Sequence, residues 1–263
     1  MEGGMNALLS RSWIRALIGL IAPGLFLIWW QMQAQAGGAH ALAFAPLQSV
    51  GAAFVELAVR GSLFPDMAST LSRSLSGLAI GGTLGIALGV AMAIWRPLDR
   101  VLNPLLQAIR QVPLMGWLPL LGLWVGTGQG TELIVVSLSA FFPTLLNSFE
   151  GVAGVERRFV EVGQIYGFTP LQRFRLILLP AAMPLILTGL TQGLAFAWIA
   201  SIASEILLGV GGGLGVTMQL AQMQQRIDII LVAILVTAAL GFTINRLFLR
   251  LRQHLLRWQA PLR

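Results

Sequence analysis

Cysteine and lysine are both absent from the 263 residues, and histidine occurs only twice. Without cysteine there is no disulfide framework and no thiolate chemistry. A Walker A phosphate loop needs a lysine, so this chain is not a P-loop ATPase by itself. The two histidines, His40 and His254, do not form a metal site at any familiar spacing. No nucleophile has a histidine partner and no segment pairs two carboxylates, so we expect no enzymatic activity and no bound cofactor or metal.

Charge is also scarce. Only 10% of the residues are charged and 56% are hydrophobic, with a mean hydropathy of +0.80, whereas a soluble domain carries about 25% charged residues. This composition predicts an all-α membrane protein whose residues 1–263 form one transmembrane domain of about six spans. The expected spans are residues 14–30, 70–95, 103–125, 131–149, 181–208 and 227–248.

The first span is interpreted as an uncleaved helix; a secretory signal is the alternative. Residues 31–68 are expected to form an external loop, with an amphipathic helix over 47–59 along the membrane surface. Residues 209–215 are glycine-rich but do not match a dinucleotide fingerprint, and we predict a flexible external turn there.

Glycine and proline mark two of the spans. In the second span, four glycines recur at a spacing of four and fall on one helical stripe, which lets another helix backbone approach closely. They are Gly77, Gly81, Gly85 and Gly89. A loosely packed, lipid-facing stripe is the alternative. In the third span, three prolines predict breaks in the helix, which are tolerated at membrane depth only where protein or a water-filled cavity satisfies the backbone.

All 17 basic residues are arginine, and 13 of them fall on the same side of a six-span topology. By the positive-inside rule this side is cytoplasmic, with both chain termini and the loop between spans four and five. The net charge of +7 is therefore assigned to cytoplasmic loops, and no nucleic-acid partner is expected.

The loop between spans four and five, residues 154–180, is a polar island between long apolar segments. Apolar residues recur at helical spacing over 154–165. Gly167 suits a helix C-terminus, because glycine adopts the left-handed conformation without a Cβ clash. Thr169 suits an N-cap and Pro170 the first position of a second helix. The loop is therefore predicted to be a helix–turn–helix.

Five positions of this loop have a fixed spacing: Glu161, Gly167, Ile177, Leu179 and Pro180. The pattern resembles the EAA loop of permease subunits of bacterial ABC importers, with Val162 and Gly163 in place of two alanines. An ordinary surface hairpin is the alternative.

The resemblance implies a type I ABC importer permease fold in which this cytoplasmic helix–turn–helix docks on a separate ATPase subunit. Glu161 would anchor the loop by charge pairing, for example with an arginine. The residues that would couple to the ATPase are Glu161, Val162, Gly163, Tyr166, Gly167, Phe168 and Thr169.

Three charges lie inside predicted spans: Arg73, Arg110 and Glu205. A charge at membrane depth costs about 3 kcal/mol and should face a partner or water. We hypothesise that Glu205 pairs with an arginine or helps form a gate in a translocation path. The alternative for each charge is an interfacial or snorkelling side chain without a transport role.

The resemblance extends over residues 65–250. Trp198 lies seven residues before Glu205 and is followed by a Gly-Leu-Gly sequence at 213–215, and similar motifs occur at 110–119 and 142–148. Together these resemble the nitrate, sulfonate and taurine branch of importer permeases, and within it the aliphatic sulfonate permeases. The path residues suggested by the resemblance and the buried charges are Arg73, Arg110, Trp198 and Glu205.

The mechanism that the resemblance implies is alternating access in the bacterial inner membrane. The expected partners are two copies of an ATPase subunit, which carries the ATP-Mg, a second copy of this permease, and a periplasmic or lipid-anchored substrate-binding protein. A stand-alone secondary transporter or channel driven by an ion gradient is the alternative, although no internal repeat supports it. A membrane enzyme is a third possibility, without any candidate site.

Overall fold

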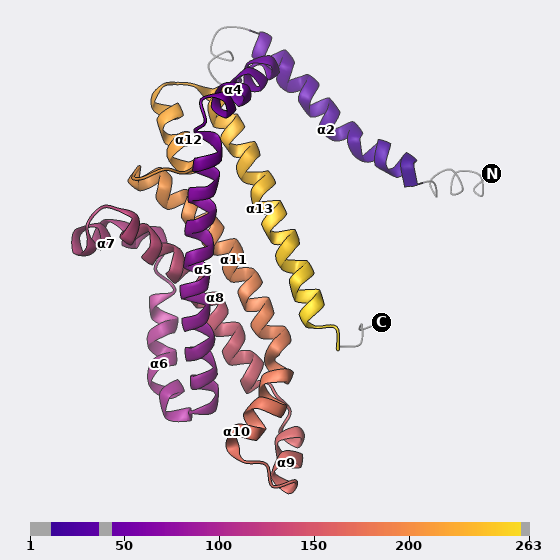
Figure 1. Cartoon of the computed structure of the whole chain (residues 1–263), viewed down its shortest axis with the longest axis vertical. Helices are drawn as coiled ribbons and strands as arrows, with labels where there is room; N and C mark the ends of the chain where they lie inside the picture. The colour runs from indigo at the N-terminus through magenta and orange to yellow at the C-terminus, as the bar shows by residue number, and fades with distance from the viewer. Residues whose placement is uncertain (1–11, 37–43, 259–263) are drawn as a thin grey trace, which may run out of the picture.

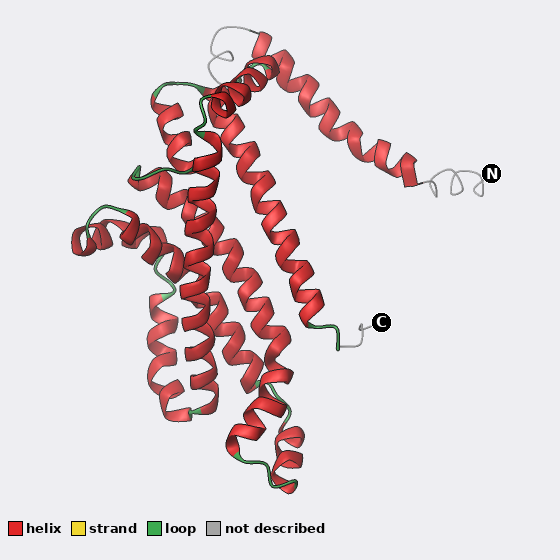
Figure 2. Cartoon of the chain, viewed as in Figure 1, coloured by secondary structure: helices red, strands yellow, loops and turns green. Residues whose placement is uncertain are grey.

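The computed structural model describes residues 12–36 and 44–258, and every regular element in these two ranges is a helix (Figure 2). In chain order the elements are α2 (Ser12–Gln35), α4 (Leu47–Val59), α5 (Leu63–Ile94), α6 (Arg96–Ile109), η1 (Leu114–Trp117), α7 (Leu118–Val125), α8 (Gln129–Ala153), α9 (Arg157–Ile165), α10 (Pro170–Arg173), η2 (Phe174–Leu178), α11 (Leu179–Leu208), α12 (Leu214–Met223) and α13 (Ile227–Leu255).

The centre of the fold is the packing of α8 between α5 and α11, with α13 alongside (Figure 1). These helices are long and apolar, and they bury small and branched side chains where they meet. One core cluster consists of Leu78, Val136, Ala140, Leu194, Ala197 and Ala200. The small size of the alanines allows the helix axes to come close together.

Glycines on both neighbours bring their backbones against α8. A Cβ on Gly85 of α5 would lie 2.7 Å from the carbonyl oxygen of Phe141, and a Cβ on Gly193 of α11 would lie 2.8 Å from Thr144 Oγ1. The other glycines of the α5 stripe, Gly77, Gly81 and Gly89, also face α8 at distances that leave no room for a Cβ. The stripe is therefore a helix–helix contact and not a lipid-facing surface.

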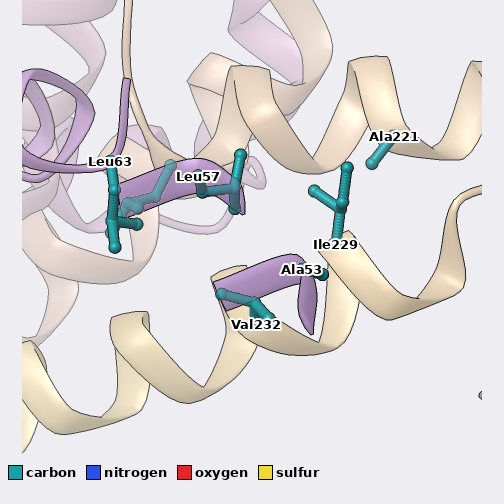
Figure 3. Close-up of a cluster of buried hydrophobic side chains, with 7 residues drawn as sticks. Ala53, Leu57, Leu63, Ala221, Ile229 and Val232 are labelled. Atoms are coloured by element: carbon teal, nitrogen blue, oxygen red, sulfur yellow. The ribbon is translucent and has the colours of Figure 1, made fainter. Parts of the chain in front are cut away.

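A second cluster joins α4, α12 and the beginnings of α5 and α13 at one end of the bundle (Figure 3). Its buried members are Ala53, Leu57, Leu63, Leu214, Ala221, Ile229 and Val232. Arg226, just before α13, donates hydrogen bonds to Glu56 on α4 and to Asp228. α4 has the bounds that the sequence predicted, and these contacts fix it against the end of the bundle.

Four helical segments are long and apolar enough to cross a membrane: Leu63–Ile94, Gln129–Ala153, Pro170–Leu208 and Ile227–Leu255. The first predicted span is helical as part of α2, which extends away from the bundle (Figure 1), but it is not among these four. The prediction of six spans thus stays a prediction.

The third predicted span, residues 103–125, is not one helix. It divides into α6 and the segment Leu114–Val125, whose axes differ by 87°. Pro113 stands at the break, in extended conformation, and Pro104 is accommodated inside α6. Residues 96–100, which lie between the second and third predicted spans, are also helical. These residues form the first turn of α6, because Pro97 suits a helix start after the extended Trp95.

Candidate functional site: the polar hairpin and a buried ion cluster

The polar island forms a compact hairpin of α9, α10 and η2 at the end of the bundle opposite α4 (Figure 1). α9 begins at Arg157, three residues later than the apolar spacing suggested, because α8 continues to Ala153. Gly167 has φ +69°, as the sequence predicted. The amide of Gly167 donates to the carbonyl oxygen of Gln164, and the amide of Phe168 donates to that of Gly163. This pair of bonds is a Schellman motif.

The second helix of the hairpin starts with a complete capping box. The Thr169 hydroxyl accepts a hydrogen bond from the amide of Gln172, and the Gln172 side chain accepts one from the amide of Thr169. Pro170 occupies the first helical position, where its missing N–H costs nothing. The turn between the two helices is therefore fixed by local interactions at both of its ends.

Gly163 explains one departure from the EAA pattern. It is buried, and a Cβ there would lie 2.6 Å from Ile177 Cδ1, across the hairpin. Glycine thus lets η2 pack directly against α9. Beside this contact, an apolar groove of about 610 Å³ opens along the hairpin, with Phe159, Phe168 and Trp258 among its lining residues.

The tip of the hairpin presents apolar side chains to the surroundings. Ile165 is 84% exposed and Tyr166 is 75% exposed. Val162 and Leu171 are exposed as well. Glu161 is also exposed, and it makes no ion pair in residues 12–36 and 44–258. The charge pairing expected for Glu161 is thus not found in the described part of this chain.

At the other end of the three-helix core, Arg73 lies between two glutamates from different helices. Its Nε is 2.7 Å from Glu132 Oε2 on α8, and its Nη1 forms an ion pair with Glu205 Oε1 on α11. Arg73 is 8% exposed, and both glutamates are completely buried. The expectation that Glu205 pairs with an arginine is therefore met, and Arg73 is not a snorkelling side chain.

Glu205 is the best-satisfied carboxylate of this cluster. Besides the ion pair it accepts hydrogen bonds from Thr70 Oγ1 at 2.9 Å, from Ser201 Oγ at 3.3 Å and from the amide of Gly215 at 2.8 Å. The hydroxyl of Thr70 in turn accepts from the amide of Leu214. A network of this kind in a low-dielectric interior fixes its members relative to one another.

The glycine-rich segment, predicted to be a flexible external turn, packs over this cluster in the structure. Its Gly212 carbonyl oxygen accepts hydrogen bonds from Ser69 and Arg73, and its Gly213 amide donates to Asp66 at 3.1 Å. A Cβ on Gly213 would meet the Glu205 carboxylate, so glycine is needed for the close approach. Residues 214–223 continue as α12, a helix that the sequence reasoning missed.

The four residues proposed for the path do not form one site. Arg110 is exposed where α6 ends and lines a small pocket with Asn103 and Gln107. Trp198 faces the opposite neighbour, with its indole against Gly241 of α13. Only Arg73 and Glu205 meet.

Two members of the cluster, Glu132 and Asp66, were not predicted. A signal for Glu132 existed, because it is an acidic residue at the beginning of the fourth predicted span. Such residues are common in first helical turns, where they interact with the helix dipole, so the position alone does not indicate a buried ion pair. In residues 12–36 and 44–258 no group of three or more histidine and acidic side chains could hold a metal ion.

Solved structures of ABC transporters contain chains with a similar helical fold. The crystal structure of an amino acid ABC transporter with histidines contains a chain of this fold. It aligns with a TM-score of 0.62 and 16% sequence identity, over 78% of this chain and 97% of that one.

Sequence comparison identifies the family. Residues 81–258 match the model of the binding-protein-dependent transport system inner membrane component, and the chain belongs to this family. It is 31% identical over 231 residues to the "Putative aliphatic sulfonates transport permease protein SsuC" of Escherichia coli, covering 88% of each chain. It is 29% identical over 241 residues to the protein of that name from Bacillus subtilis, covering 92% of this chain and 87% of the other. The chain is a permease subunit and not an enzyme.

Proposed function

We propose that this chain is the membrane-spanning subunit of an ATP-driven importer, and that the hairpin of residues 154–180 binds a separate ATPase subunit. The observation that carries the proposal is the hairpin itself. Its turn is held by a Schellman motif and a capping box, yet its tip exposes Ile165, Tyr166 and Leu171. A rigid tip with exposed aromatic and aliphatic side chains is suited to a protein partner, because apolar anchors dominate the energetics of interfaces.

The distribution of charge supports a cytoplasmic position for the hairpin. The ends of α5 and α13 and the start of α6 lie toward the same end of the bundle as the hairpin (Figure 1). The arginines of these segments and of the hairpin are Arg96, Arg100, Arg157, Arg158, Arg173, Arg175, Arg246, Arg250, Arg252 and Arg257. Arg60, Arg73 and Arg226 belong to the opposite end. By the positive-inside rule, the hairpin end faces the cytoplasm of a bacterial inner membrane, with both termini.

The transported substrate is proposed to be a small anion such as an aliphatic sulfonate, taurine or nitrate, on the basis of the two sulfonate-permease relatives and the sequence resemblance. The chain carries one hairpin, so two copies would present two hairpins to two ATPase subunits. A substrate-binding protein would deliver the anion at the α4 end, and ATP-driven closure of the ATPase pair would open and close the path by alternating access.

The test is a pull-down of the purified chain in mild detergent with the candidate ATPase subunit. Gly167→Pro and Glu161→Lys are expected to lose binding. Val59→Ser, on the exposed face of α4 at the other end of the bundle, is the matched control and should bind like the wild type. Circular dichroism verifies that all variants keep their helices. Equal binding by all variants would refute the proposal. Uptake driven by an ion gradient without ATP would replace it with a secondary transporter.

Sulfonate, taurine and nitrate uptake into proteoliposomes that contain the assembled importer tests the substrate class. ATP-dependent uptake of one of these anions, with no uptake when the binding protein is left out, is the expected result. Uptake of none of them would contradict the proposed substrate class and leave the ATPase contact to be judged by the pull-down.

A further inference from the structure

The buried cluster has more acidic than basic groups. Arg73 is its single cation in the part of the chain that the structure describes, and Glu132 and Glu205 both face it from other helices. All three side chains are at most 8% exposed. With both glutamates ionised, a net negative charge would be enclosed between three helices. Such a charge is costly at membrane depth unless it is paired or neutralised.

The two glutamates differ sharply in what their oxygens contact. Glu205 accepts hydrogen bonds from a threonine, a serine, an arginine and a backbone amide. Glu132 approaches Arg73 Nε at 2.7 Å, but neither of its oxygens accepts an aligned hydrogen bond within the described residues. An ionised carboxylate can accept at about four lone-pair positions. The environment therefore supports a charge on Glu205 and does not support one on Glu132.

Among residues 12–36 and 44–258, no other charged group near Glu132 changes this balance. The elements that pack against α8 are α5, α11, α7 and η1. α7 and η1 contain no titratable residue. On α5, the remaining group is Asp66, whose oxygens accept from the amide of Gly213 and the hydroxyl of Thr217. Asp66 therefore brings no positive charge to the cluster that could balance Glu132.

We infer that Glu132 is a proton-binding site: in this conformation it is held as the neutral acid, next to an ionised Arg73–Glu205 pair. If the outer ends of α5, α8 and α11 separated, Glu132 would meet water, where a glutamic acid ionises near pH 4. Opening of this end of the bundle at neutral pH would then release one proton from Glu132. The inference does not depend on the ATPase contact of the hairpin.

Infrared spectroscopy of the full chain in lipid nanodiscs at neutral pH tests the protonation state. The wild type should show a carboxylic acid C=O band that shifts in D2O. Glu132→Gln should abolish this band. Asp66→Asn, the matched control, should keep it, because the Asp66 oxygens contact Gly213 and Thr217 and not the Arg73–Glu132 pair. Glu205→Gln should abolish it as well, since Glu132 would then ionise as the remaining partner of Arg73. Absence of the band in the wild type, or its persistence in Glu132→Gln, would overturn the inference.

Thermal unfolding gives a second, independent readout. A neutral Glu132 can be replaced by its neutral isostere with little effect, so Glu132→Gln should stay within about 2 °C of the wild-type Tm. Glu205→Gln removes the better-satisfied carboxylate of a buried pair, and it should lower the Tm by on the order of 10 °C. If Glu132→Gln lowered the Tm as much as Glu205→Gln, Glu132 would be a charged partner of Arg73 and the inference would be wrong.

Discussion

Replacing Gly85 by alanine should destabilise the bundle by forcing α5 away from α8. A Cβ on Gly85 would lie 2.7 Å from the Phe141 carbonyl oxygen and 3.0 Å from the Leu145 amide nitrogen, whereas ordinary contact begins at 3.4 Å. Both neighbours are backbone atoms of a helix, which cannot rotate out of the way. The two helix axes must therefore separate by several tenths of an ångström along their contact, in an interior that is packed without free volume.

The magnitude follows from two opposing effects. Overpacking a tight interior costs about 1–3 kcal/mol. Alanine in place of glycine within a helix stabilises the fold by about 0.5–1 kcal/mol. The net loss is therefore at most about 2.5 kcal/mol, which corresponds to a fall of up to about 10 °C in Tm for a chain of this length.

Two other glycines provide graded controls. A Cβ on Gly82, in the same helix, would meet the ends of two flexible side chains, Leu190 at 2.9 Å and Leu78 at 3.8 Å. A Cβ on Gly51 of α4 would meet nothing within 4 Å. Thermal unfolding of the purified chain should show the largest loss for Gly85→Ala, a smaller effect for Gly82→Ala, and an unchanged or higher Tm for Gly51→Ala. Equal Tm values for all three variants would show that backbone contact does not hold α5 against α8.

Three further results are expected. Gly167→Ala should lower the stability of the hairpin by about 1 kcal/mol, because φ +69° is strained for alanine. It should also weaken ATPase binding in the pull-down. Gly167→Asn should retain more of this binding, because asparagine tolerates the left-handed conformation. Arg73→Met would leave the buried Glu205 carboxylate without its cation, and a loss of about 3–5 kcal/mol should appear as a lower Tm and poor accumulation in the membrane. The hydrogen bond from Arg226 holds the pKa of Glu56 below its usual value. The attachment of α4 through this bond should therefore persist above about pH 4, and it should be lost as the pH falls through the lowered pKa of Glu56. A spin label on Val59→Cys should become mobile at that point, and Arg226→Gln should make it mobile at neutral pH; a label that stays immobile in both cases would contradict this attachment.

Local signals in the sequence predicted local structure well. The turn of the hairpin follows from single residues whose backbone preferences act without distant partners, as Gly167 and Thr169 show. The bounds of α4 follow from an amphipathic segment after a proline. The break at Pro113 was expected, but its angle of 87° was not. A proline removes one hydrogen bond, and the packing of the two pieces against other helices decides the angle.

The buried cluster could be predicted only in part. A glutamate inside a span indicated a partner, and Arg73 was a candidate for it. The second glutamate and the closing glycine-rich segment depend on how α5, α8 and α11 align along their axes. That alignment is decided by contacts between residues far apart in the chain, such as Thr70 of α5 with Glu205 of α11. Glycines at 211–213 suggested flexibility, although here glycine serves the close approach of backbone to a carboxylate.

The hairpin and the cluster are connected by a single helix. The hairpin continues through η2 into α11, which runs without interruption from Leu179 to Leu208 and carries Glu205 three residues before its end. Thirty residues of α-helix extend about 45 Å, comparable to the full thickness of a bilayer. A displacement of the hairpin by a partner would therefore act on α11 at one end, and the Arg73 cluster would resist or follow it at the other. Coupling between distant sites needs a continuous physical element, and α11 is such an element. The stability of the Arg73 cluster would then decide how readily the end of the bundle far from the hairpin opens. Variants of Glu205 should consequently alter transport even with the hairpin intact, whereas variants of the hairpin should leave the cluster, and its protonated carboxyl, unchanged.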